Sequence, residues 1–86
     1  GTTYLHTGDL DYGGVKIFQY IKKRIFPNLQ PYLMDTQTHE QYKAYGEPIE
    51  TSKLEKLQRT TEPLLQPLID KICAEKQVIE QESFLF

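Results

Sequence analysis

Two aspartates separated by one residue, Asp9 and Asp11, are the side chains whose types and spacing could do chemistry. They lie in the stretch HTGDLDYGG, which follows a β-like run and contains two glycines. In an extended backbone, residues i and i+2 project to the same side, so both carboxylates could bind one divalent cation. Mg²⁺ or Mn²⁺ bound in this way keeps several waters and takes further ligands from a substrate phosphate. The motif therefore indicates a metal site where a strand ends.

A structural role explains the same residues without a metal. Asp11 could be the N-cap of a following helix, and Asp9 could be a turn residue. Gly13 and Gly14 could leave the backbone open to a phosphate chain, or they could simply permit a tight connection from strand to helix. The spacing alone leaves both interpretations open.

Four further side chains are candidates for an outer shell around such a metal: Asp35, Lys16, Glu80 and Glu82. Asp35 closes a second apolar run and would reach the same edge of a sheet as the acidic pair. Lys16 lies in the first helical turn after that pair, and the two glutamates lie in the run IEQES near the end of the chain. A turn former at Asp35 and solvated helix faces for the others are the alternatives.

The elements that would position these residues form a βαβ unit. Residues 3–8 (TYLHTG) favour a strand, and residues 29–35 (LQPYLMD) favour a second one. Between them, apolar residues at spacings of three and four predict an amphipathic helix of about three turns: Val15, Ile17, Phe18, Ile21 and Ile25. Short connections imply parallel strands and a right-handed crossover. We therefore predict an α/β fold with a small parallel sheet flanked by helices, whose carboxyl edge is where open α/β sheets bind ligands.

The polar side of this helix is basic, with Lys16, Lys22, Lys23 and Arg24. These cations could contact a nucleic acid backbone. A solvated polar face is the better explanation for Lys22 and Lys23. Lys16, next to the acidic pair, is the cation whose role merits a test.

The rest of the chain gives weaker signals. Residues 36–50 show no sustained period, so we expect an irregular segment with at most one helical turn over 40–44 and a solvent-exposed His39. Ser52 and Glu55 form a capping-box pattern that predicts the start of a helix.

Two prolines divide the helical region that follows. We expect a second helix to be entered near 61–63 and to be kinked or restarted at Pro67. Val78 and Ile79 could form a short edge strand or a final helical turn, and the residues 84–86 (FLF) resemble apolar surface that is normally covered.

Composition limits the classes of protein. The 86 residues form at most one small domain, and the net charge of −2 gives no global basic field, so any phosphate partner must be bound locally. The single cysteine, Cys73, excludes an internal disulfide. No apolar run approaches the about 18 to 20 residues that cross a bilayer, so we expect a cytoplasmic protein and no membrane partner. The chain starts directly in an extended apolar pattern without Met, so we expect a fragment of a larger domain.

The runs GDLDYGGVKIFQYIKK (8–23) and FPNLQPYLMD (26–35) resemble the C-terminal Toprim domain of Wadjet D-subunit-like (JetD-like) proteins. These proteins are the nuclease components of a bacterial plasmid-defence system, and their domain is similar to the Toprim domain of the topoisomerase VI A subunit. The resemblance covers essentially the whole chain, 1–86, including the Glu-Gln-Glu run of IEQES.

The resemblance implies a function for the parent protein and an incomplete site here. Asp9 and Asp11 match the D-x-D that holds Mg²⁺ in Toprim enzymes, which also use a glutamate on an earlier strand that this sequence lacks. The fragment should therefore bind Mg²⁺ weakly and cleave nothing, whereas the full-length parent would cleave DNA alongside other subunits of a defence complex. A homodimer through an open sheet edge is also expected. The competing hypothesis is a non-catalytic α/β assembly module.

Overall fold

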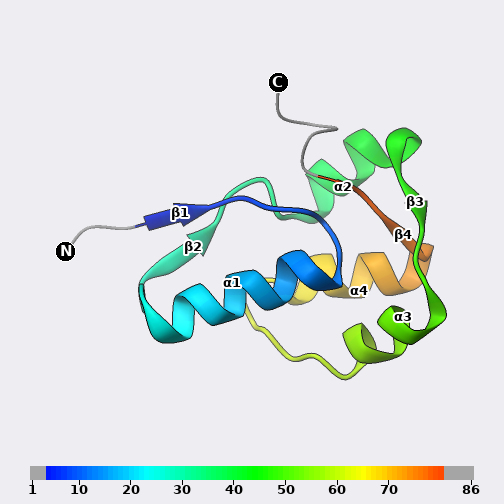
Figure 1. The fold of residues 1–86 in the computed structure, drawn as a ribbon. Helices are drawn as coiled ribbons and strands as arrows, with labels where there is room; N and C mark the ends of the chain where they lie inside the picture. The colour runs from blue at the N-terminus through cyan, green and yellow to red at the C-terminus, as the bar shows by residue number, and fades with distance from the viewer. Residues whose placement is uncertain (1–3, 81–86) are drawn as a thin grey trace.

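The first half of the chain forms the predicted βαβ unit. The structure, a computed structural model, describes residues 4–80. β1 (Tyr4–His6) leads into α1 (Tyr12–Arg24), and β2 (Leu29–Pro31) returns beside β1 as a parallel strand. Figure 1 shows this two-stranded sheet at one end of the molecule, with α1 crossing below it. The predicted small α/β fold is confirmed.

The second strand is shorter than the predicted 29–35. It ends at Pro31, and Leu33 then adopts a left-handed backbone with φ of 59°. This conformation turns the chain out of the sheet direction. Asp35 therefore does not end a strand, as predicted, but is the N-cap of α2 (Thr36–Tyr42), where its Oδ1 accepts a hydrogen bond of 2.7 Å from the Thr38 amide.

The segment predicted to be irregular is mostly helical, so that prediction is wrong. α2 is followed by the 3₁₀ helix η1 (Lys43–Tyr45) and by the two-residue strand β3 (Glu47–Pro48). The buried residues of α2 are Thr38 and His39. Because both are polar types, the helix has no apolar period that a sequence pattern could reveal.

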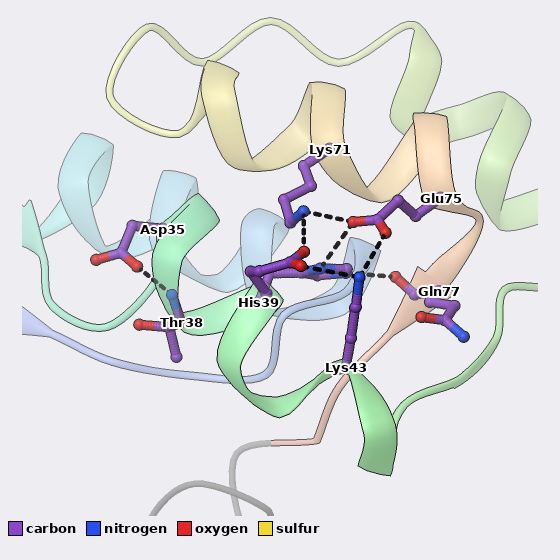
Figure 2. Close-up of polar contacts among 8 residues, drawn as sticks. Asp35, Thr38, His39, Lys43, Lys71, Glu75 and Gln77 are labelled. Atoms are coloured by element: carbon purple, nitrogen blue, oxygen red, sulfur yellow. Dashed lines mark hydrogen bonds and ion pairs between the residues drawn. The ribbon is translucent and has the colours of Figure 1, made fainter.

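His39 is fully buried, whereas we predicted an exposed loop residue. Its Nε2 lies 3.0 Å from the carbonyl oxygen of Gln77, and its Nδ1 faces the Glu75 carboxylate at 3.6 Å (Figure 2). A carbonyl oxygen only accepts, so Nε2 carries a proton. Lys71 lies 2.5 Å from Glu75 and 2.8 Å from Glu40. These contacts join α2 to residues 71–77, which lie more than thirty positions later in the chain.

The next two helices along the chain are α3 (Thr51–Gln58) and α4 (Gln66–Glu75). The predicted start of α3 at this point is confirmed, but the capping box is not formed. Ser52 lies inside the helix, and the N-cap is Glu50, which makes no side-chain capping bond. The prediction that the next helix is entered near 61–63 is wrong, because α4 begins only at Gln66.

α4 instead begins at the predicted restart. Pro67 occupies its first turn, where the missing N–H has no helical partner to lose. Beyond it, β4 (Gln77–Val78) pairs antiparallel with β3, which confirms the short-strand alternative for this segment. The residues 84–86 lie outside the described residues.

The core lies between α1, α3 and α4. Its buried apolar side chains among residues 4–80 are Leu10, Val15, Phe18, Leu29, Met34, Leu57, Leu65, Leu68, Ile69, Ile72 and Ile79. Ile17 and Ile25, predicted to share the apolar face of α1, are each 55% exposed, so that part of the prediction is wrong. Ile17 lies about 200° around the helix from Val15, on the solvent side. Across residues 4–80, no helix has the length and apolar character needed to cross a membrane.

The ion pairs of α2 make the stability of the fold depend on pH. Hydrogen bonds from Lys71 and then Lys43 lower the pKa of Glu40 from 4.5 to about 2. Because the folded-state pKa lies below the unfolded value, the stabilisation is fully present above the unfolded pKa and is lost as the pH falls toward 2.

We therefore expect Glu40→Gln to lower the melting temperature at pH 7, and the difference from the wild type to shrink progressively below pH 4.5. The effect should also weaken with added salt, because Glu40 is exposed. Thermal denaturation followed by circular dichroism measures both. The control is Glu55→Gln on α3, since Glu55 forms no ion pair among the residues described; an equal loss in both variants would contradict the assignment.

Candidate functional site

The acidic pair lies on the turn that joins β1 to α1, on either side of Leu10. Leu10 is fully buried, its amide donates to the Ile79 carbonyl at 2.8 Å, and its carbonyl accepts from the Ile79 amide at 3.2 Å. Neighbouring residues of an extended segment point to opposite sides. With Leu10 turned into the core, Asp9 and Asp11 flank it on the side away from the core.

Asp11 is the N-cap of α1. Its Oδ1 accepts a hydrogen bond of 2.7 Å from the Gly14 amide, so the capping role considered from the sequence is confirmed. A carboxylate has a second oxygen with its own lone pairs. Capping by Oδ1 is therefore compatible with a cation bound at the other oxygen, and metal binding by Asp9 and Asp11 stays a prediction.

The environment of Asp11 disfavours its negative charge. Burial raises the pKa of the Asp11 carboxyl, the Gly14 amide opposes this, and the nearby Asp9 carboxylate raises the pKa further. Lys53 of α3 acts in the other direction, more weakly. A divalent cation would relieve both unfavourable effects, because it neutralises two neighbouring carboxylates at once.

Gly14 permits the tight turn that holds the pair. A Cβ at this position would lie within 1.9 Å of the Asp9 carbonyl oxygen, so no larger residue fits without moving the backbone. Gly13 is different because it is exposed. A Cβ at this position would lie 3.4 Å from Asp11 Oδ1, which is an ordinary contact distance. The tight-connection interpretation is confirmed for Gly14, which is buried and so does not lie open to a phosphate.

A pocket of about 240 Å³ adjoins Asp11. Its charged lining residues come from distant parts of the chain: Asp11, Glu47, Glu50, Lys53 and Glu80. Sequence reasoning identified Asp11 and Glu80 but missed the other three, because they lie in or beside a segment without recognisable period. Four of these five charged residues carry carboxylates, and the pocket has room for several waters, which suits a hard cation such as Mg²⁺ that keeps part of its hydration shell.

The other predicted outer-shell residues are dispersed. Asp35 caps α2, and within residues 4–80 no three His, Cys, Asp or Glu side chains are grouped closely enough to hold one metal ion. Lys16 is exposed on α1, with its ammonium group 6.0 Å from the centroid of the Tyr12 ring. Glu82 lies outside the described residues.

The two glycines of the turn provide a matched pair of variants. Gly14→Ala forces a methyl group into the Asp9 backbone, and we expect a loss of about 1–3 kcal/mol or more in the free energy of unfolding. Gly13→Ala, one residue earlier in the same helix, should be neutral or stabilising by up to about 1 kcal/mol. Urea denaturation of both variants measures the difference, and similar values would refute the packing role of Gly14.

Substitutions at Asp11 separate its cap from its charge. Asp11→Asn keeps an acceptor oxygen and removes a charge that burial disfavours, so stability at pH 7 without divalent cations should equal or exceed that of the wild type. Asp11→Ala removes the cap and should cost about 1 kcal/mol. Since the folded-state pKa of Asp11 is raised, any advantage of Asn develops as the pH rises above 3.8 and disappears below it. Urea titrations at pH 7 and pH 3 measure this, and an Asn variant as unstable as the Ala variant would disprove it.

Comparison with known proteins confirms the JetD-like part of the resemblance. The family model described as "Wadjet protein JetD, C-terminal" matches residues 2–86. A curated relative, "Wadjet protein JetD" of Bacillus cereus (strain Q1), is 43% identical over 81 residues, which cover 90% of this chain and 20% of the relative. The chain thus spans about a fifth of the length of that relative. With the family match extending over nearly all of its residues, this chain belongs to the family of JetD C-terminal domains.

Proposed function

We propose that the chain is the C-terminal, Toprim-like part of a longer JetD-like protein that cleaves DNA with Mg²⁺ or Mn²⁺ in a bacterial plasmid-defence system. The family membership supports the defence role and the association with other subunits. The observation that carries the metal-dependent part is the pair of neighbouring carboxylates, one of them with a raised pKa, beside an acidic pocket. Such a protein would act in the cytoplasm, where plasmids are found.

In this proposal, Asp9 and Asp11 hold the cation. When bound, it would neutralise charge on the scissile phosphate and stabilise the leaving oxygen. The chain's own contribution is to keep the two carboxylates in place. Leu10 is hydrogen-bonded to Ile79, and the Asp11 carboxylate is oriented by the Gly14 amide. Catalytic groups need this kind of fixed positioning to act efficiently.

The proposed site needs a further acidic ligand from the longer protein. Among residues 4–80, no three His, Cys, Asp or Glu side chains lie close enough together to hold one metal ion. Asp9 and Asp11 would therefore need at least one further ligand. We therefore expect the 86-residue chain to bind the cation weakly and to leave DNA intact. Cleavage would require the glutamate that Toprim enzymes carry on an earlier strand.

A second candidate is a non-catalytic assembly module. Leu5 on β1 is 64% exposed, and Tyr32, just after β2, is 51% exposed. A two-stranded parallel sheet with such apolar neighbours offers an edge to another strand, either from another subunit or from a second copy in a homodimer. In this alternative the acidic pair would serve only the turn and the helix cap.

Metal binding distinguishes the two candidates. Titration of the chain with Mn²⁺, followed by NMR line broadening, should affect the amides of residues 9–14 first. Asp9→Asn and Asp11→Asn should each weaken binding about tenfold or more, because each removes one charged ligand. Asparagine is used instead of alanine at Asp11 because it keeps the helix cap.

The matched control is Asp35→Asn, since Asp35 caps α2 in the same way that Asp11 caps α1. This variant should bind Mn²⁺ like the wild type. In the longer protein, Asp9→Asn and Asp11→Asn should abolish cleavage of plasmid DNA in Mg²⁺. Full cleavage by either variant, or unchanged Mn²⁺ broadening, would leave the assembly module as the better function.

A further inference from the structure

A polar groove of about 370 Å³ lies between α1 and α3, next to the turn that carries the acidic pair. It begins at Tyr12, the residue after Asp11, and is lined by Lys16 of α1, by Lys56 of α3, and by Arg59 and two threonines that follow α3. Both helices contribute buried side chains to the core. The cations therefore extend from supports whose relative position is fixed.

Two of these cations converge on one aromatic ring. The ammonium group of Lys16 lies 6.0 Å from the centroid of Tyr12, and that of Lys56 lies 5.9 Å from it. The electron-rich face of a tyrosine ring attracts each ammonium group. This attraction offsets part of the repulsion between the two ammonium groups and keeps both at the groove.

Within the described part of the chain, the cations in this groove have no acidic partners. Among residues 4–80, the ion pairs involve Lys22, His39, Lys43 and Lys71 but not Lys16, Lys56 or Arg59. The position of a surface lysine is usually explained by a neighbouring carboxylate with which it forms an ion pair. Three neighbouring cations without a counter-charge, in a chain of net charge −2, are complementary to an external anion.

The basic surface continues along the solvent side of α1. Lys16 also lines a larger groove of about 980 Å³, together with Lys23, Arg24 and the exposed Tyr20. A helix of this length extends about 20 Å. A nucleic acid strand carries a phosphate for about every 3.4 Å of helix axis, so an extended polyanion matches this line of cations better than a single phosphate does.

We propose that Lys16, Lys56 and Arg59 form a docking site for the phosphodiester backbone of a nucleic acid. The inference deepens the proposed function and rests on it for the identity of the polymer. Phosphate contacts come mainly from Arg and Lys, with help from hydroxyl and amide side chains, and the groove contains these groups. A protein partner would need an apolar centre, whereas Tyr12 is the one aromatic side chain among the groove's lining residues.

The test is fluorescence anisotropy of a labelled duplex of about 20 base pairs with the chain in EDTA, over about 50–200 mM KCl. Lys16→Gln, Lys56→Gln and Arg59→Gln should each weaken binding several-fold at about 0.1 M salt and reduce the slope of log K against log salt by about 0.9. Lys76→Gln is the matched control, because Lys76 is also exposed but lies at the end of α4. It should leave the slope unchanged, and circular dichroism verifies that every variant is folded.

Three outcomes decide the proposal. Loss of slope in the three groove variants but not in Lys76→Gln supports it, whereas the same slope in all four overturns it. Poly-glutamate that competes as well as DNA would overturn it in favour of an acidic protein partner. Asp9→Asn and Asp11→Asn test the metal site separately: they should weaken Mn²⁺ binding as stated above and still bind the duplex in EDTA, so the two proposals can fail independently.

Discussion

The contact between Gly14 and the backbone of Asp9 is the constraint on which the arrangement of the site depends. No side chain fits between them, since a Cβ would come within 1.9 Å of the Asp9 oxygen. The close approach allows α1 to start directly after the turn, with the Asp11 carboxylate hydrogen-bonded to the Gly14 amide. One glycine thereby sets the distance between the strand, the helix and the two carboxylates. A looser turn would let the acidic side chains separate to reduce their repulsion.

This turn is held from the other end of the chain. Leu10 exchanges two hydrogen bonds with Ile79, which directly follows β4, and β4 in turn contacts His39 through the carbonyl of Gln77. Figure 2 shows His39 together with the lysines and Glu75 that connect α2 to α4. The order of the turn therefore depends in part on the buried His39 and on the partly exposed ion pairs around it. The hydrogen bond of His39 Nε2 favours this arrangement, because moving β4 away would leave that buried polar group unpaired.

Charges of opposite sign are separated around the same turn. Carboxylates from the β1–α1 turn, β3 and the segments around them face one pocket, whereas Lys16, Lys56 and Arg59 face the groove between α1 and α3. Lys53 lies at the acidic pocket and reduces its negative potential. The overall charge of −2 does not reveal this division. A cation and a polyanion could therefore bind side by side, as the chemistry proposed for the longer protein would require.

The sequence by itself determined the βαβ unit, because its signals are local: a change of period at Gly14, β-forming residues before it, and a proline after the helix. It also identified Asp9 and Asp11 as candidates, but it did not decide whether Asp11 caps the helix or binds a metal ion. Only the tertiary structure decided that His39 is buried, that residues 36–45 are helical, and that Glu47 and Glu50 share a pocket with Asp11. It also brought Lys56 and Arg59 beside Lys16. The physical reason is that these features depend on packing between segments some forty residues apart, such as His39 with Gln77 at a separation of 38, and no local pattern encodes such contacts.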